Sequence, residues 1–219
     1  MKLTPYGKPQ TTVVFTIILI LAIVGALFCP ARNSSVITIL LIGSAILAFF
    51  RDPERKVPKA DNILLSPADG KITDITELDN HEFFDGPVLR IGIFLSVLNV
   101  HINRAPCKGR VSWKFEKPGL CLNALKSELA SQKNQSCSIG IDCPDHPARK
   151  VVVKQITGAI ARRIICDCRE GSELIAGERY GMIKFGSRTE LFIPKNSAAQ
   201  IMVKPGDKAK AGETVFVKY

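Results

Sequence analysis

The chain has 219 residues, a formal net charge of +10 and 46% hydrophobic residues. That length is enough for one domain with a hydrophobic core and a small appendage. Seven cysteines, an odd number at irregular spacing, argue against a disulfide framework and favour reduced thiols. The basic balance favours an anionic partner, and the apolar segments that open the chain favour lipid headgroups over nucleic acid, so no nucleic-acid partner is expected.

Two apolar segments come first. Residues 12–29, TVVFTIILILAIVGALFC, carry no charge and are just long enough to cross a hydrocarbon layer of roughly 30 Å. Residues 36–50, VITILLIGSAILAFF, are short for a full span, so a tilted hairpin and a re-entrant pair both stay open. A cleavable signal peptide is disfavoured because a second apolar run follows and the sequence has no small-residue cleavage site. We therefore predict a helical membrane hairpin over residues 1–50.

Basic residues flank this hairpin on both sides. They are Lys2 and Lys8 before it, and Arg51, Arg55, Lys56 and Lys59 after it. By the positive-inside rule both ends of the hairpin lie in the cytoplasm. The sequence thus predicts a protein of the cell membrane whose second domain, residues 51–219, lies on the cytoplasmic side.

The second domain consists of short strand-like runs between Gly, Pro and Asp turns. PVLRIGIFLSV and KVVVKQITG, for example, are rich in β-branched residues. KPGDKAKAGETVF, residues 204–216, resembles the turn-strand-turn pattern of the biotinyl/lipoyl barrel-sandwich hybrid. One helix is expected over residues 121–134, where Leu122, Leu125 and Leu129 recur at helical spacing. We predict a mainly β domain, a sandwich similar to the barrel-sandwich hybrid, with one or two short helices.

Some of the cysteines and histidines are candidate metal ligands. The candidates are Cys137, Cys143, His146, Cys166 and Cys168. Their spacings match no common zinc pattern, so we expect no metal. His81 and His146 stand in polar, loop-like surroundings, and both are expected to be exposed to solvent.

Two other residues are stronger candidates for chemistry. His101 follows an apolar strand in GIFLSVLNVHINRAP and has polar neighbours on both sides. Asp69 precedes a glycine in LLSPADGKI, where a plain hairpin corner is the alternative interpretation. A carboxylate can orient an imidazole and stabilise its charged form, so the two residues are a plausible pair for acid and base work.

Residues 184–194, KFGSRTELFIP, place the dipeptide Gly186-Ser187 between two strand-like runs. Gly-Ser is an ordinary turn by itself. As a reactive site it would need a base beside the weakly nucleophilic Ser187 hydroxyl and donors for an oxyanion. Gly186 would leave its own carbonyl unshielded by a Cβ.

A series of motifs resembles one known family. FFRDPER, SPADGKI, FLSVLNVHINRAP, QITGAIARRI, GERYGMIKFGSR and VKPGDKAKAGETVF occur in the order found in phosphatidylserine decarboxylases of the short, membrane-anchored form. The likeness runs from about residue 49 to the C-terminus. Several matches in series are far more specific than any one of them.

The resemblance implies a carboxy-lyase that cuts itself at Gly186-Ser187 into residues 1–186 and 187–219. Ser187 would become a covalent pyruvoyl cofactor, which forms a Schiff base with phosphatidylserine and yields phosphatidylethanolamine and carbon dioxide. Asp69 and His101 would serve Ser187 during self-cleavage, and His101 would later donate a proton. The implied partners are the phospholipid substrate, the bilayer, the two cleaved chains and a second copy in a homodimer.

The sequence departs from the family pattern at Asn99, where an acid is expected. An amide can orient His101 but cannot stabilise an imidazolium by charge, so slower maturation is a hypothesis. Arg104, Arg162 and Arg163 are candidates for binding a carboxylate or phosphate or for orienting groups at the site. For Arg162 and Arg163 a solvated basic face is an equal alternative.

Other interpretations stay open. Residues 113–129, WKFEKPGLCLNALKSEL, fit either contact with the bilayer interface or a leucine stripe in the core. A zinc peptidase is disfavoured because HIN lacks the second histidine of an H-x-H pair, and a lipoyl carrier because no lysine lies between apolar residues at a hairpin tip. The remaining alternative is an uncleaved, inactive β-sandwich scaffold or carrier-like module. The sequence does not fix the lipid backbone of the substrate.

Overall fold

A computed structural model of the protein describes residues 2–28, 32–124, 127–159, 163–184, 187–195 and 199–219. The chain divides into two compact units, Met1–Glu54 and Arg55–Tyr219. The predicted boundary after residue 50 and the catalytic role of the remainder stay predictions.

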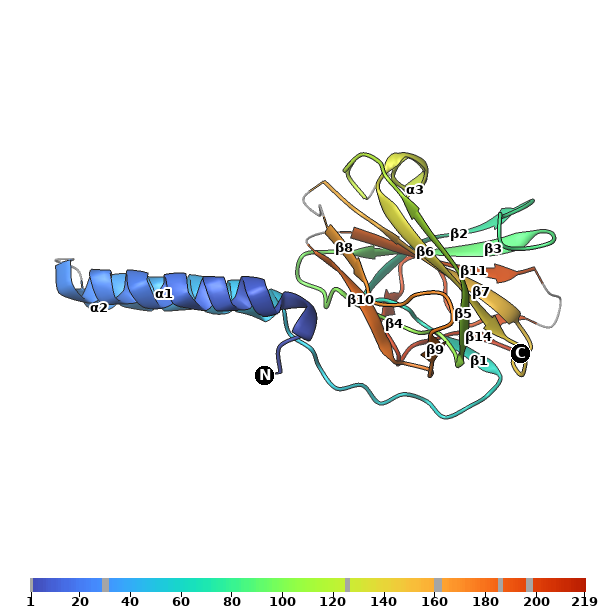
Figure 1. The fold of residues 1–219 in the computed structure, drawn as a ribbon, viewed down its shortest axis with the longest axis horizontal. Coiled ribbons are helices and arrows are strands. Elements are labelled where there is room, and N and C mark those ends of the chain that lie inside the picture. The colour runs from blue at the N-terminus through green and yellow to red at the C-terminus, as the bar shows by residue number, and fades with distance from the viewer. Residues whose placement is uncertain (1, 29–31, 125–126, 160–162, 185–186, 196–198) are drawn as a thin grey trace. The chain divides into compact units, whose positions relative to one another are not determined.

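The first unit is a pair of helices. A 3-10 helix, η1 (Pro5–Gly7), leads into α1 (Lys8–Phe28), and α2 (Arg32–Phe49) returns alongside α1 (Figure 1). The two helices approach closely at Gly43, where a Cβ would collide with the Ile18 side chain. Small residues allow such close helix contact in a membrane.

The helical pair is apolar on its outside as well. Phe15 and Leu27 are more than 60% exposed. Within the described residues, one helix, Pro5–Leu27, is long and apolar enough to cross a membrane, and Ser34–Phe49 is a shorter apolar helix. Length and composition therefore support membrane association. Both a tilted hairpin and a re-entrant pair stay compatible with these helices.

The second unit is mainly β, as predicted. Its described elements are β1 (Ile63–Leu65), β2 (Gly70–Leu78), β3 (Val88–Leu95), β4 (Ile102–Arg104), β5 (Gly109–Lys117), α3 (Ser127–Lys133), β6 (Ser136–Cys143), β7 (Arg149–Ile156), β8 (Arg163–Cys166), β9 (Glu173–Leu174), β10 (Arg179–Lys184), β11 (Ser187–Pro194), β12 (Gln200–Ile201), β13 (Lys208–Ala209) and β14 (Val215–Lys218). The pairings described between these strands are antiparallel.

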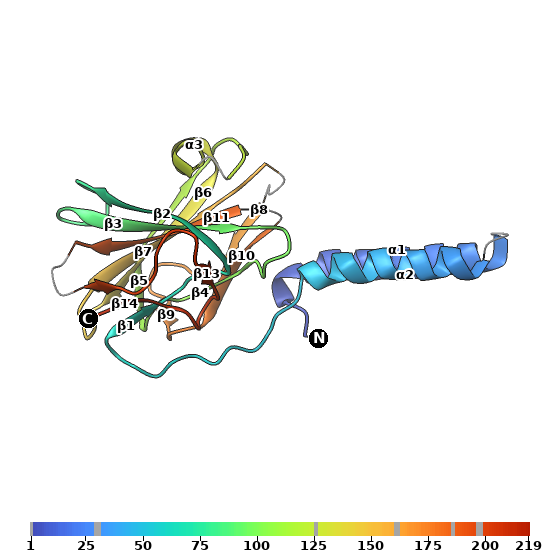
Figure 2. The same cartoon turned by 180° about the vertical axis from the view of Figure 1, so that it is seen from behind.

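One curled sheet dominates this unit (Figure 2). Its strand order is β13-β2-β3-β11-β7-β6-β5-β9, and it curls into a half-barrel. Two three-stranded sheets, β4-β10-β8 and β1-β14-β12, complete the unit. The core lies inside the curl, where Ile91, Ile93, Leu191 and Ile193 are almost fully buried.

Strand β11 lies within the large sheet and is buried on both faces. Successive side chains of a strand point to opposite faces. Leu191 and Ile193 join the main core, and Phe192 belongs to a second apolar cluster with Val88 and Val152. Ser187 and Thr189 therefore share the face of the main core, and Arg188 and Glu190 lie on the other face.

The glycine turns predicted near the C-terminus are confirmed. Gly206 of KPGD has φ +102° and Gly212 of AGE has φ +73°. Glycine has no Cβ penalty in this left-handed region. These two turns set the ends of the short strands β13 and β14.

The helix predicted over residues 121–134 was too long. Of the described residues in this segment, Ser127–Lys133 is the helical part, and residues 125–126 lie outside the described residues. The Asn134 side chain accepts a hydrogen bond from Leu122 N and donates one to Leu122 O, at 2.9 Å each. These two bonds hold Leu122 outside the helix despite its helical spacing from Leu129.

Candidate active site

Ser187 is the first residue of β11 and is fully buried. It pairs with Leu95, the last residue of β3. Its Oγ is buried and has no hydrogen-bond partner among the described residues. The chain passes from β10 in the small sheet to β11 in the large sheet between Lys184 and Ser187. Gly186, the other half of the predicted cleavage site, lies outside the described residues.

His101 lies just beyond the loop that follows β3 and is fully buried. Its Nδ1 is 3.0 Å from the main-chain oxygen of Asn99. A carbonyl oxygen only accepts, so this contact selects the tautomer with the proton on Nδ1 and leaves Nε2 as the acceptor nitrogen. His101 O accepts a hydrogen bond from Ile183 N at 3.1 Å, which ties His101 to the strand that leads to Ser187.

Asn99 organises the loop before His101. Its Oδ1 accepts hydrogen bonds from Ser96 N at 2.9 Å and from Ser96 Oγ at 2.8 Å. Asn99 N donates in turn to Ser96 O at 2.9 Å. The side chain therefore closes a turn, and the main chain of the same residue orients His101.

Asp69 is held in one position at the start of β2. Arg55 Nη2 donates to its two carboxylate oxygens at 2.9 and 2.8 Å, and Ala211 N donates to Oδ1 at 2.8 Å. The next residue, Gly70, packs so tightly on β3 that a Cβ would collide with Phe94 O. Since β3 lies between β2 and β11, Asp69 and Ser187 lie at the same end of the sheet. A direct role of Asp69 toward His101 stays a prediction.

The arginines singled out in the sequence occupy different places. Arg104 is buried and donates from Nη1 to Gly177 O at 2.9 Å. Arg163 is exposed at the start of β8 and pairs with Lys184 across to β10. Arg162 lies outside the described residues. Of the two described arginines in this group, Arg163 is therefore exposed to solvent, whereas Arg104 is buried and supports a turn.

Lys184 was not singled out in the sequence, yet it is buried three residues before Ser187. Burial lowers the pKa of its ammonium group, and the charge of Arg163 lowers it further. Lys184 therefore provides an ammonium group three residues before Ser187, close in sequence to the predicted cleavage point. No feature of the KFGS stretch alone indicated that this lysine would be buried.

A buried polar cluster joins the small sheet to the large one beside the site. Asn103 Nδ2 donates to Thr189 Oγ1 at 3.0 Å, and Gln155 Nε2 donates to Asn103 Oδ1 at 2.9 Å. Thr189 lies on the same face of β11 as Ser187. These bonds fix the spacing between β4, β7 and β11.

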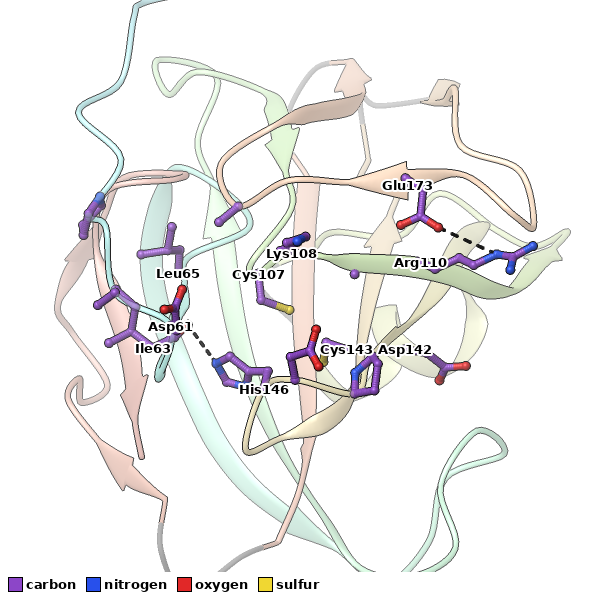
Figure 3. A pocket seen from close by; sticks show the side chains of 16 residues that line it. Asp61, Ile63, Leu65, Cys107, Lys108, Arg110, Asp142, Cys143, His146 and Glu173 are labelled. Carbon is purple, nitrogen blue, oxygen red and sulfur yellow. Dashed lines mark hydrogen bonds and ion pairs between the residues drawn. The ribbon is translucent and has the colours of Figure 1, made fainter.

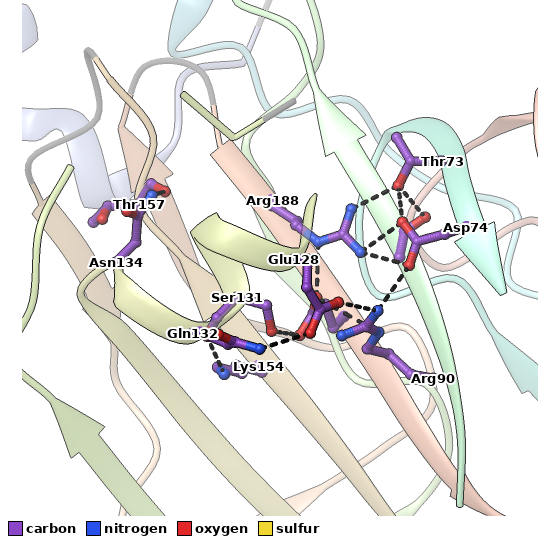
Figure 4. Close-up of polar contacts among 12 residues, drawn as sticks. Thr73, Asp74, Arg90, Glu128, Ser131, Gln132, Asn134, Lys154, Thr157 and Arg188 are labelled. Atoms are coloured by element: carbon purple, nitrogen blue, oxygen red, sulfur yellow. Dashed lines mark hydrogen bonds and ion pairs between the residues drawn. The ribbon is translucent and has the colours of Figure 1, made fainter. Parts of the chain in front are cut away.

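On the opposite face of β11, Arg188 forms a buried network (Figure 4). Its Nη2 donates to both Asp74 oxygens at 2.8 Å, its Nη1 to Thr73 Oγ1 at 2.6 Å, and its Nε to Glu190 Oε1 at 2.8 Å. Gly92 makes room for the guanidinium, since a Cβ there would collide with it. The residue directly after Ser187 is therefore fixed by four charge-assisted bonds.

The environment of Asp74 favours its charged form. Burial alone would raise the pKa of this carboxyl group. The hydrogen bond from Thr73 and the charges of Arg188 and Arg90 outweigh burial, so the pKa is lowered from 3.8. No local sequence signal predicts this pair, because Asp74 and Arg188 are 114 residues apart.

Helix α3 covers this network. Ser131 Oγ donates to Glu190 Oε2 at 2.9 Å, and Arg90 Nη2 contacts Glu128 Oε2 at 3.1 Å (Figure 4). Lys154 Nζ donates to Ser131 O at 2.8 Å. Helix α3 thus shields the charges on the outer face of β11 from water.

A cavity of about 550 Å³ lies elsewhere in this unit (Figure 3). Its lining includes Cys107, Cys143 and His146 and none of the predicted catalytic residues. His146 was expected to be exposed, but it is buried, with Nε2 3.1 Å from Ile63 O and Nδ1 accepting from Ala148 N. The described residues contain no group of three or more His, Cys, Asp or Glu side chains arranged for a metal ion.

Comparison with known proteins gives a consistent result. The family model of phosphatidylserine decarboxylase matches residues 42–217. A phosphatidylserine decarboxylase proenzyme of Rhodopirellula baltica is 41% identical over 213 residues, covering 97% of this chain and 86% of the relative. One from Chlorobium luteolum is 39% identical and covers 99% of this chain and all of its own length. One from Syntrophus aciditrophicus is 43% identical over 76% of each chain.

Proposed function

The chain belongs to the phosphatidylserine decarboxylase family of carboxy-lyases, and from this premise we propose that it cuts its own Gly186–Ser187 bond and then decarboxylates phosphatidylserine to phosphatidylethanolamine. The observation that carries the proposal is the Ser187 hydroxyl, which is buried and lacks a hydrogen-bond partner among the described residues. Leaving such a group unsatisfied costs about 1–3 kcal/mol, a cost that a reactive role explains.

In the proposed self-cleavage, the Ser187 side chain comes within hydrogen-bond reach of His101, whose Nε2 takes the proton of Ser187 Oγ, and the oxygen attacks the carbonyl carbon of Gly186. The peptide C–N bond breaks as the Ser187 nitrogen is protonated, which leaves an ester between the two residues. Loss of the Ser187 Cα proton expels the Gly186 carboxylate, and the resulting dehydroalanine takes up water and releases ammonia. The Nδ1–H···O=C contact with Asn99 supports this role, because it keeps Nε2 as the accepting nitrogen.

Asp69 supplies the negative charge in this account. Its two oxygens are held by Arg55 and by the Ala211 amide, so the carboxylate has one fixed orientation at the same end of the sheet as Ser187. We assign Asp69 the stabilisation of protonated His101. Arg55, which the sequence presented only as a charge after the hairpin, becomes the residue that positions Asp69.

The residues present fit a pyruvoyl group at position 187, because Ser187 is a buried polar residue at the head of a firmly held strand. Such a group supplies a ketone that binds the substrate amine and takes up the electron pair released with carbon dioxide. His101, once protonated on Nε2, holds a proton that it can return to the substrate α-carbon. We assign Arg163, which is exposed at the start of β8, the binding of the substrate carboxylate or phosphate.

The fold also explains how the small chain would be retained after the cut. Strand β11 pairs with β3 on one side and with β7 on the other, and Arg188 is bonded to Asp74 and Thr73 of β2. A chain of residues 187–219 would thus keep both ladders and the buried network. The new terminus would stay where Ser187 lies.

The apolar helix Pro5–Leu27 supports a place at the membrane that contains the substrate. We assign the second unit to the cytoplasmic side on the charge pattern of the flanking residues. A homodimer is part of the proposal on the family resemblance alone.

Turnover in proteoliposomes tests the function. Wild-type protein should release carbon dioxide from carboxyl-labelled phosphatidylserine and form phosphatidylethanolamine, and Ser187→Ala should do neither. Equal product from both proteins would contradict the proposed chemistry. If wild-type protein stays uncut and inactive, the scaffold interpretation takes its place.

A further inference from the structure

Three large apolar side chains project into solvent at the end of the sheet where Ser187 lies. Leu98 is 80% exposed and Val97 is 47% exposed, both in the loop between β3 and β4. Leu120 is 56% exposed in the segment before α3. Large exposed apolar side chains at the end of the sheet that holds Ser187 mark a candidate interaction site.

The topology places these side chains on both sides of the β11 strand end. On one side, Ser187 pairs with Leu95, and the loop with Val97 and Leu98 follows directly. On the other side, Arg188 pairs with Ile156 of β7. Leu120 O accepts hydrogen bonds from Gln135 N at 2.9 Å and from Thr157 Oγ1 at 3.3 Å, the residues next to β6 and β7 at this end.

Both apolar segments are built features of the fold. The Ser96–Asn99 turn is closed by the two bonds to Asn99 Oδ1. The Leu120 segment is clamped by the side chain of Asn134, which is fully buried and bonds to both main-chain groups of Leu122. The ordered backbone therefore holds these leucines exposed. Contact of their apolar surface with water is unfavourable, and a partner that covered them would remove this cost.

Three exposed basic residues lie at this end of the unit. Lys117 ends β5, Lys133 ends α3 and Arg163 begins β8, all at this end of the unit and all exposed. The nearby acid Glu116 is paired with Lys114 at 3.0 Å. Basic groups around apolar tips match a surface of anionic lipid headgroups over acyl chains.

We propose that Val97, Leu98 and Leu120 form a lipid-entry rim, which inserts into the interface of an anionic bilayer and turns the Ser187 end of the sheet toward its membrane substrate. The inference rests on the proposed function for its choice of partner, because the substrate of the family is a membrane phospholipid. A second copy of the chain is the competing occupant. The basic groups disfavour a second copy, because a symmetric interface over this face would bring the basic groups of both copies together and they would repel each other.

Tryptophan quenching by brominated lipid tests the rim without any turnover. The chain has one tryptophan, Trp113, which is partly buried and gives a constant background. Leu98→Trp in proteoliposomes of phosphatidylserine and brominated phosphatidylcholine should show emission that is strongly quenched. Ile175→Trp is the matched control: Ile175 is 64% exposed but lies beside β9, which pairs with the opposite end of β5 from Lys117. Both variants carry the same apolar helices, so only their position on the second unit differs.

A kinetic measurement gives an independent test. The double variant Leu98→Asn, Leu120→Asn is compared with wild type on phosphatidylserine in vesicles and on a short-chain, monomeric phosphatidylserine. The ratio of vesicle to monomer turnover should fall by roughly tenfold, the scale expected when the burial of a leucine side chain is lost. Ile175→Asn should keep the wild-type ratio.

Equal quenching at positions 98 and 175, or none at 98, overturns the rim. The rim is also overturned if position 98 shows no quenching and the double variant converts a dimer to a monomer. This face would then be a subunit interface. The quenching is repeated with Ser187→Ala in the background. Strong quenching at position 98 in a protein without decarboxylase activity would keep the rim and reject the proposed function.

Discussion

The Nδ1 atom of His101 lies 3.0 Å from the main-chain oxygen of Asn99, and the Asn99 side chain is bonded to Ser96. The backbone therefore sets the tautomer of His101, and the identity of side chain 99 affects the ring only through the turn it closes and the charge it carries. Two effects can thus be separated in the structure that cannot be separated in the sequence: the orientation of the histidine and the stabilisation of its charged form.

Replacing His101 tests its place as the base. His101→Gln should slow self-cleavage by roughly 10²-fold or more, the usual contribution of a positioned acid or base. The rate is followed by the appearance of the chain of residues 187–219 on denaturing gels. His81→Gln is the matched control, since His81 is half-buried among Phe84, Trp113 and Phe192. Equal rates for the two variants would rule out His101 as the base.

A charge at position 99 is expected to speed maturation. Asn99→Asp can still accept both hydrogen bonds from Ser96, and it adds a negative charge two residues from His101. We expect a several-fold faster cut, because a nearby carboxylate stabilises the imidazolium and about 1.4 kcal/mol corresponds to a tenfold change in rate. Pulse-chase labelling gives the rate. An unchanged rate would reject the hypothesis that Asn99 slows maturation.

Arg55 should matter to both stability and maturation. Its side chain and that of Asp69 are 5% and 11% exposed, so Arg55→Met leaves a buried carboxylate whose remaining partner among the described residues is the Ala211 amide. The loss should be roughly 3 kcal/mol of unfolding free energy, with slower cleavage. Urea unfolding in detergent and gel analysis measure the two effects.

The double variant Arg55→Met, Asp69→Asn provides the control for that experiment. It removes the unpaired charge, so it should regain stability while cleavage stays slow. Recovery of fast cleavage in the double variant would show that Asp69 is not needed as a carboxylate.

The bond between Arg188 and Asp74 predicts a pH dependence. The pKa of Asp74 is lowered from 3.8, so its stabilising contribution is fully present above that value and is lost as pH falls through the lower folded pKa. The difference in unfolding free energy between wild type and Asp74→Asn should thus be constant near neutral pH and shrink below about pH 4. Urea titrations across this range measure it, and a difference independent of pH would contradict the assignment.

Much of the fold could be predicted from local sequence. Runs of β-branched residues gave the strands of the large sheet, and Gly206 and Gly212 marked turns that need a positive φ. The predicted helix was too long because leucine spacing says nothing about the Asn134 side chain that binds both main-chain groups of Leu122. His146 was assigned to the surface because its polar neighbours in sequence do not reveal the carbonyl of Ile63 above it.

The site could be predicted only in part. Ser187, His101 and Asp69 were predicted because each stands in a short motif, and their roles stay predictions. Their supporting partners were missed, since Arg55 meets Asp69 and Arg188 meets Asp74 only after the strands pair. Burial of Lys184 depends in the same way on tertiary packing. A single sequence carries no local signal for such long-range ion pairs.

The mass of the purified protein under denaturing conditions tests the central claim most directly. The account predicts two chains, residues 1–186 and 187–219, with the smaller one lighter by one ammonia than a peptide that begins with serine, and a single uncut chain for Ser187→Ala. A single wild-type chain of 24.0 kDa would contradict self-cleavage and with it the proposed pyruvoyl chemistry.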